Sequence, residues 1–196
     1  MTKARIANDV YPTESGIIDK LAGIMPELFN QKTYFEPCAG RGDLVKAIAN
    51  HTLPSAKIET AERFPADDNW HTYQYFDATD PNDWATINKK WDVVITNPPF
   101  KFAPAIATEC WRNTKRFLVL ILRLTFLEQC SNRREFWEST QDHLVMLAPI
   151  NPRPRFRSDT NGNDSVTCAV FVWDKSHSWK ELGVMSPYQM ISDWRK

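Results

Sequence analysis

Hydrophobic residues fall into short apolar runs that alternate with amphipathic stretches along the chain. The runs have the length of strands, and the stretches between them place apolar residues at helical spacing. Strands that alternate with helices are typical of a mostly parallel sheet. The predicted strands cover residues 33–37, 57–62, 72–76, 91–96, 117–122, 143–147 and 166–173.

Helices are expected between most of these strands. Residues 14–29 carry apolar side chains at helical spacing, and Pro26 interrupts that segment. Seven strands with intervening helices predict an α/β fold, an open sheet with helices on both faces. The other predicted helices cover residues 43–50, 81–89, 104–116 and 126–140.

Composition favours a single globular domain over residues 1–196. The chain is 42% hydrophobic and 24% charged, close to the globular average. Its four cysteines lie far apart, which argues against a zinc ribbon and a disulfide scaffold, so we predict no metal site. No apolar run reaches the roughly 18 residues of a membrane span. The first ten residues lack the apolar core of a signal peptide, so a cytoplasmic location is expected.

Charge is unevenly distributed although its formal sum is zero. Residues 101–157 contain 10 Lys and Arg against 5 Asp and Glu. A basic segment in a neutral chain is consistent with a face that binds a polyanion. Ordinary fluctuation of surface charge is the alternative.

Two glycines stand between the first predicted strand and the next helix. Gly40 and Gly42 would let the backbone approach a ligand closely, beside the free N–H groups of the helix N-terminus. The pattern is G-x-G, without the six-residue dinucleotide fingerprint or the Lys-Ser/Thr of a phosphate-binding loop. It therefore favours a nucleoside ligand, with an ordinary tight turn as the alternative.

Acidic residues end the next two strands. Glu62 stands 20 residues after Gly42, where a carboxylate can accept hydrogen bonds from two ribose hydroxyls, and Glu59 is the competing choice. Asp77 would accept from an adenine amino group or cap a turn. Either glutamate is otherwise an exposed charge.

The tetrapeptide Asn97-Pro98-Pro99-Phe100 follows an apolar strand directly. Two prolines remove backbone donors and leave the carbonyls of Asn97 and Pro98 to point into a cleft. With the Asn97 side chain they would accept both hydrogens of a planar exocyclic amine, which localises its lone pair toward an electrophile. Phe100 offers a ring on which a base can stack. The alternative is a proline-rich strand exit.

EPCAGRGD followed by NPPF resembles the S-adenosylmethionine-dependent amino-methyltransferases that methylate adenine N6 and related planar nitrogens. The motif order is similar to the gamma arrangement of DNA adenine methyltransferases, and the closest resemblance is to small phage and prophage enzymes. It implies a Rossmann-like methyltransferase fold, with a seven-stranded, mostly parallel sheet and an antiparallel last strand. It also implies catalysis by Asn97, Pro98, Pro99 and Phe100. The residues implied in binding S-adenosylmethionine are Tyr11, Pro12, Thr13, Glu36, Pro37, Cys38, Ala39, Gly40, Gly42, Glu62, Asp77 and Asn97.

An arginine-rich arm precedes the last predicted strand. Arg153, Arg155 and Arg157 alternate with Pro154 and Phe156. In the family this region lies beside the target base, so the resemblance implies phosphate contacts by the arginines and base stacking by Phe156. A solvated loop is the alternative.

The resulting hypothesis is methyl transfer to adenine N6 in DNA. Nucleic acid is the expected partner, and no separate target-recognition domain is expected. The same chemistry on RNA, on cytosine N4 or on a protein glutamine is the first alternative. Asn97 disfavours cytosine N4 because those enzymes more often carry serine before the prolines. Only about 30 residues precede the first predicted strand, which disfavours the glutamine enzymes and their helical domain. A non-catalytic nucleic-acid-binding module with this fold is the second alternative.

Overall fold

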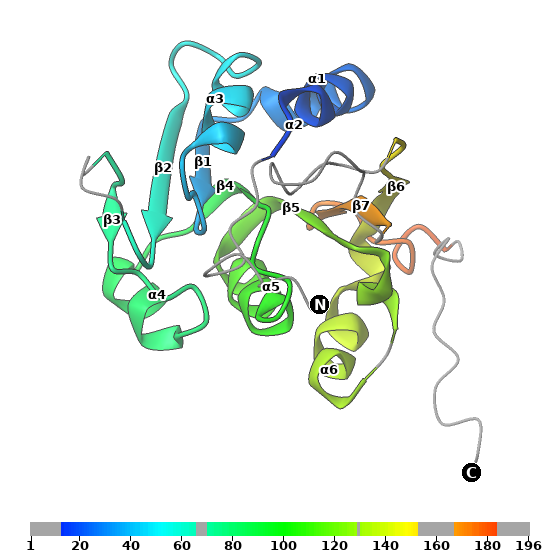
Figure 1. Cartoon of the computed structure of the whole chain (residues 1–196). Coiled ribbons are helices and arrows are strands. Elements are labelled where there is room, and N and C mark those ends of the chain that lie inside the picture. Colours follow the sequence, from blue (N-terminus) through cyan, green and yellow to red (C-terminus); the bar gives the residue numbers. More distant parts are fainter. Residues whose placement is uncertain (1–12, 66–69, 129, 153–166, 184–196) are drawn as a thin grey trace, which may run out of the picture.

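The computed structural model describes residues 13–65, 70–128, 130–152 and 167–183. Its centre is a seven-stranded sheet with the strand order β3-β2-β1-β4-β5-β7-β6 (Figure 1). β1 to β5 pair in parallel, and β7 runs antiparallel to both of its neighbours. The prediction of an antiparallel last strand is therefore confirmed. The strands are β1 (Thr33–Glu36), β2 (Lys57–Glu62), β3 (Tyr73–Gln74), β4 (Trp91–Thr96), β5 (Thr114–Arg123), β6 (Leu144–Pro149) and β7 (Cys168–Asp174).

Helices cover both faces of the sheet, as the sequence predicted. One face carries the first three helices and the other face carries the last three (Figure 1). The helices are α1 (Ser15–Ile24), α2 (Pro26–Phe29), α3 (Asp43–Ala49), α4 (Pro81–Ile87), α5 (Ala103–Asn113) and α6 (Ser131–Thr140), with 3₁₀ turns η2 (Leu124–Leu127) and η3 (Gln141–His143).

β5 divides the hydrophobic core into its two halves. Phe117, Val119 and Ile121 point toward α1, α2 and α3, whereas Leu118 and Leu120 point toward α4, α5 and α6. All five side chains are fully buried. Successive side chains of a strand point to opposite faces, so an uninterrupted apolar run is what a strand covered on both sides requires.

The strand order reverses between β1 and β4, which lie side by side in parallel. From β1 the chain continues through α3 toward β2 and β3, whereas from β4 it continues through α5 toward β5. Ligands of open α/β sheets bind in the crevice outside the carboxyl ends of the strands at such a switch point. The fold therefore places the glycine turn and Asn97-Pro98-Pro99-Phe100 at one edge of the sheet.

Several predicted boundaries were wrong. β3 is only two residues long, because the chain turns at Tyr75, which has a φ of 56°. β5 begins at Thr114 and not at residue 117, because Thr114 already pairs with Trp91 of β4; α5 ends correspondingly early. The helix predicted over residues 126–140 begins at Ser131, after the 3₁₀ turn η2 that buries Phe126.

In the described part of the chain, none of the helices has the length and hydrophobicity that crossing a bilayer requires.

Candidate cofactor and acceptor site

The glycine turn after β1 is built on backbone hydrogen bonds. The amide of Ala39 donates to the carbonyl of Ala61 on β2 at 3.0 Å, and the amide of Gly42 donates to Ala39 at 2.8 Å. Gly40 and Gly42 have φ values of 52° and 81°, which side chains rarely tolerate. A Cβ at position 42 would also come within 2.8 Å of the Trp70 indole. The turn therefore requires glycine at position 42 and favours it at position 40.

Glu62 joins the end of β2 to this turn. One carboxylate oxygen accepts from the amide of Gly40 at 2.8 Å, and the other accepts from the amide of Phe64 at 3.0 Å. A carboxylate has about four acceptor positions, so two remain for the hydroxyls of a ligand. Glu62 therefore lies where the sequence predicted it, beside the glycine turn.

Glu59, the competing choice, has a structural role. Its carboxylate accepts hydrogen bonds from Lys89 and from the indole of Trp91, and the hydroxyl of Tyr73 lies at 3.5 Å. Lys89 and these hydrogen bonds lower its pKa against the opposing effect of burial. Because these contacts tie β2 to β3 and β4, Glu62 is the better candidate for a ligand contact.

Asp77 follows β3 and caps a turn. Its Oδ1 accepts from the amide and the hydroxyl of Thr79 at 3.0 and 2.7 Å, and its Oδ2 lies 3.1 Å from the Arg63 guanidinium. The turn-capping alternative therefore describes Asp77 in this structure. An adenine contact would have to share Oδ2 with Arg63.

Glu36 ends β1 and is almost completely buried. Its Oε1 accepts from the Cys38 amide at 3.3 Å, whereas Oε2 makes no hydrogen bond to any residue that the structure describes. Burial raises the pKa of Glu36 to about 8. The neighbouring Thr96 hydroxyl offsets part of this increase, although its geometry does not satisfy a hydrogen bond to Oε2. A buried acceptor of this kind fits a cationic donor.

Glu36 makes stability depend on pH in a defined direction. Its pKa is higher in the folded protein than in the unfolded chain, so the stability gained from the protonated form is present at low pH. That gain is lost as the pH rises through about 8. We therefore expect Glu36→Gln, which stays neutral, to become progressively more stable than the wild type as the pH rises.

Chemical denaturation of both proteins over a series of pH values checks this expectation. The difference in the free energy of unfolding should grow from mildly acidic to alkaline pH. A difference independent of pH would mean that Glu36 is already ionised in the folded protein.

Asn97 contacts the segment that precedes α1. Its Nδ2 donates to the hydroxyl oxygen of Thr13 at 3.2 Å, across 84 residues of sequence. Thr13 is buried. The carbonyl of Pro99 accepts from the amide of Phe102 at 2.9 Å, whereas the carbonyl of Pro98 receives no hydrogen bond from the described residues. The predicted amine acceptors are thus the Asn97 side chain and the Pro98 carbonyl, while Pro99 begins the turn into α5.

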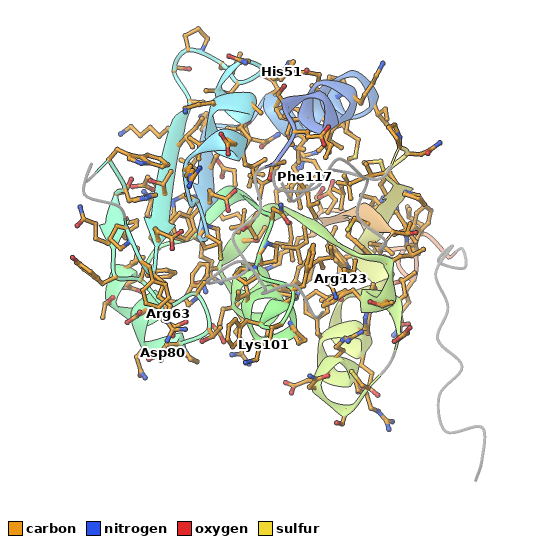
Figure 2. The ribbon with its side chains drawn as sticks, viewed as in Figure 1. His51, Arg63, Asp80, Lys101, Phe117 and Arg123 are labelled. Carbon is orange, nitrogen blue, oxygen red and sulfur yellow. The ribbon has the colours of Figure 1, made fainter. Side chains whose placement is uncertain are left out.

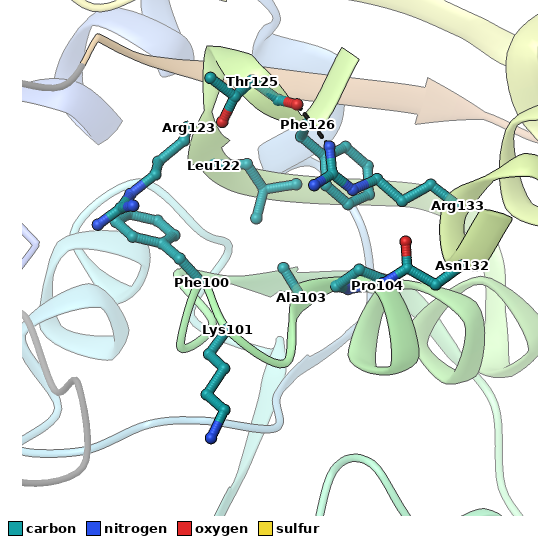
Figure 3. Close-up of a pocket in the computed structure, with 10 residues that line it drawn as sticks. All are labelled: Phe100, Lys101, Ala103, Pro104, Leu122, Arg123, Thr125, Phe126, Asn132 and Arg133. Atoms are coloured by element: carbon teal, nitrogen blue, oxygen red, sulfur yellow. Dashed lines mark hydrogen bonds between the residues drawn. The ribbon is translucent and has the colours of Figure 1, made fainter. Parts of the chain in front are cut away.

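Phe100 forms one wall of a pocket of about 270 Å³ (Figure 3). The Arg123 guanidinium lies over its ring at 4.8 Å from the ring centre. Ala103, Pro104 and Leu122 form an apolar floor. The remaining lining residues are Lys101, Thr125, Phe126, Asn132 and Arg133. Arg123 is the last residue of β5, and Lys101 lies just before the start of α5 (Figure 2).

Sequence reasoning missed Arg123 as a site residue. The only signal for it was the excess of basic residues over residues 101–157. That excess identifies a segment but not a single residue. The position of Arg123 against Phe100 depends on the pairing of β4 with β5.

Several predicted site residues lie outside the described residues: Tyr11, Pro12, Arg153, Arg155, Phe156 and Arg157. No cluster of potential metal ligands is found in the described ranges.

The fold matches solved methyltransferases. The modification subunit attributed to a type I restriction enzyme of Vibrio vulnificus is 11% identical with a TM-score of 0.64, over 86% of this chain and 45% of that one. A protein from Pyrococcus horikoshii attributed to the RNA methyltransferases is 12% identical with a TM-score of 0.61, over 88% and 90%. Magnesium protoporphyrin IX methyltransferase from Synechocystis, solved with S-adenosylmethionine bound, is 14% identical with a TM-score of 0.52, over 82% and 78%.

The chain spans less than half the length of the Vibrio protein. No protein-family model and no curated protein sequence matches it. The likeness therefore concerns the fold, and the strand order with its antiparallel β7 agrees with it. The chain has the Rossmann-like methyltransferase fold that its sequence predicted.

Proposed function

We propose that this protein transfers the methyl group of S-adenosylmethionine to the N6 amine of adenine in DNA. The observation that carries the proposal is the geometry at the end of β4. Asn97 is held by Thr13, and the Pro98 carbonyl receives no hydrogen bond from the described residues. These groups stand at the strand-order switch point, next to the glycine turn.

Residues at that switch point fit the cofactor. The unbonded Oε2 of buried Glu36 suits the ammonium group of the methionine part, and the spare acceptor positions of Glu62 suit the ribose hydroxyls. Gly40 and Gly42 remove the side chains that would stand between the turn and the ligand. Binding of the ammonium group would bring Glu36 to its charged form, because an adjacent cation lowers the pKa of a carboxyl.

S-adenosylmethionine, when bound, supplies an activated methyl group. The protein's task is to prepare a weak nucleophile, because the lone pair of an arylamine is delocalised into its ring. The Asn97 side chain and the Pro98 carbonyl would accept the two amine hydrogens in tetrahedral directions. Thr13 supports this role because it accepts from Nδ2 and so directs the other amide atom, Oδ1, away from itself. No ionisable base is required before the attack.

Adenine N6 is favoured over other acceptors by the residues of the site, and DNA is proposed over RNA on the likeness to a modification subunit. The Vibrio protein with this fold is attributed to a restriction-modification enzyme, whereas the Pyrococcus protein is attributed to RNA methylation. Asn97 before the two prolines favours adenine N6 over cytosine N4. A non-catalytic module would not need the amine acceptors.

Acceptor profiling tests the proposal. The protein is incubated with methyl-labelled S-adenosylmethionine and separately with DNA, RNA and protein acceptors. Digestion to nucleosides or amino acids then identifies the methylated group. We expect label in N6-methyladenine from DNA, and label confined to RNA or protein would replace the proposed substrate.

Phe100→Ala should lower acceptor affinity as well as rate. The aromatic ring is expected to stack on the extruded base in the ground state, and base–aromatic stacking is worth roughly 1–3 kcal/mol. That range corresponds to about a fivefold to a hundredfold or greater loss of affinity. Single-turnover rates measured over a range of acceptor concentrations give both quantities. A loss of rate without a loss of affinity would argue against stacking.

A further inference from the structure

The basic residues of the middle segment fall into two groups. Among the described residues it has seven, and four of them form ion pairs with carboxylates at 2.5 to 3.7 Å. A paired arginine or lysine adds little net positive field. The four pairs are Arg112 with Glu109, Lys115 with Asp92, Arg116 with Asp174, and Arg134 with Glu138.

The other three are Lys101, Arg123 and Arg133, and all three line the pocket beside Phe100 (Figure 3). None of them forms an ion pair with a carboxylate of the described ranges. No acidic residue among the described lining residues faces this pocket either. Among the described residues of the segment, the basic side chains without an acidic partner therefore all line one cavity.

Two helix N-termini add to this positive potential. The first residues of α5, Ala103 and Pro104, and of α6, Asn132 and Arg133, line the pocket. Neither helix has an acidic residue in its first turn or a side-chain cap on its N-terminal amides. Helix N-termini carry a partial positive charge that favours anions.

Both arginines are held in place and retain unused donors. The Arg133 guanidinium donates through Nη1 to the carbonyls of Thr125 and Glu128, at 2.5 and 2.9 Å. Arg123 is fixed by its contact with the Phe100 ring and makes no hydrogen bond to the described residues. A guanidinium has five N–H donors, and its planar arrangement suits the oxygens of a phosphate. Figure 3 shows the two groups on opposite sides of the apolar floor, with the Lys101 ammonium directed away.

We infer that this pocket binds a backbone phosphate of the DNA strand that presents its adenine to Asn97, with Arg123 and Arg133 as the phosphate ligands. The inference rests on the proposed function and adds the contact that positions the strand. Phe100 belongs both to the tetrapeptide and to the pocket wall, so base and phosphate meet the protein on neighbouring surfaces. The apolar floor of Ala103, Pro104 and Leu122 suits the deoxyribose between them.

A binding assay tests the inference without turnover. The probe is a fluorescent single-stranded DNA with one adenine, measured by anisotropy in the presence of S-adenosylhomocysteine. Arg123→Gln is expected to weaken binding roughly tenfold, since hydrogen bonds to charged groups contribute more than neutral ones. It should also reduce the log–log salt slope by roughly 0.7, the value for one phosphate contact on a single strand. Arg133→Gln should behave in the same way.

Arg134→Gln is the matched control. It removes the same charge from the next residue of α6, but Arg134 is paired with Glu138 and does not line the pocket. We expect its affinity and its salt slope to stay close to those of the wild type. Equal losses in Arg123→Gln and Arg134→Gln would overturn the inference, because the effect would then be one of overall charge.

Neutral methylphosphonates identify the ligand as a phosphate. Each phosphate near the adenine is replaced in turn, and the cost of Arg123→Gln is measured on every probe. At one position that cost should disappear, because the variant and the probe then remove the same contact. A cost that persists at every position would mean that Arg123 acts on the base through Phe100, and the inference would be wrong. This assay measures binding without methyl transfer. A failure of the phosphate inference is therefore distinguishable from a failure of the proposed function, which would appear as missing N6-methyladenine.

Discussion

Replacing Asn97 by alanine is expected to lower kcat by about 10²–10³, the usual effect of removing one preorganised polar contact to a reacting group. The Asn97 amide is held by the Thr13 hydroxyl, so its geometry does not depend on the acceptor. A hydrogen bond to the target amine should strengthen as the nitrogen becomes tetrahedral. The loss should therefore appear in kcat, with acceptor and cofactor affinity little changed.

Single-turnover rates with identification of the methylated nucleoside check this result. Thr13→Val is a useful companion variant, since it removes the oxygen that orients Asn97 and leaves the amide itself. Its rate should fall by less than that of Asn97→Ala. Full activity in Asn97→Ala would mean that the tetrapeptide is only a strand exit and that the proposed substrate is wrong.

A Gly40→Val variant is expected to lose detectable binding of S-adenosylmethionine and S-adenosylhomocysteine. Gly40 has a φ of 52°, which a β-branched residue adopts only under strain, and its amide donates to Glu62. If the backbone changes its φ to accommodate valine, that hydrogen bond breaks. The valine side chain would also occupy space next to the proposed ribose contact. Isothermal titration with each ligand measures the loss.

Gly183→Val separates this local effect from general strain. Gly183 also has a positive φ, 69°, and no atom of the described part of the chain lies within 4 Å of the Cβ that a side chain would add there. We expect Gly183→Val to retain cofactor affinity, even if it lowers the thermal stability. Unchanged affinity in Gly40→Val would remove this turn from the cofactor site.

Local patterns predicted the strands that lead to the site with high accuracy. β2 and β4 have the predicted limits, because a run of apolar residues bounded by turn residues contains its own start and end. β5 was predicted too short, since Lys115 and Arg116 read as helix residues. They belong to the strand because β4 pairs with Thr114 before them and with Phe117 after them, and such pairing is invisible in a local pattern.

The candidate site divides in the same way. The sequence alone determined where the glycine turn and the Asn97 tetrapeptide lie, since each is a short motif at the end of a strand. It preferred Glu62 by its spacing from Gly42 and left Glu59, on the same strand, as the competing choice. The choice came from the tertiary structure, in which Glu59 joins neighbouring strands and Glu62 meets Gly40.

Only the tertiary structure decided which charges and which buried groups matter. Composition located an excess of basic residues in the middle segment, and folding paired four of them with acids from other parts of the chain or from their own helix. Folding also buried Glu36 and brought Arg123 onto Phe100. A motif is a property of neighbours along the chain, whereas an electrostatic field and a shifted pKa depend on neighbours in space.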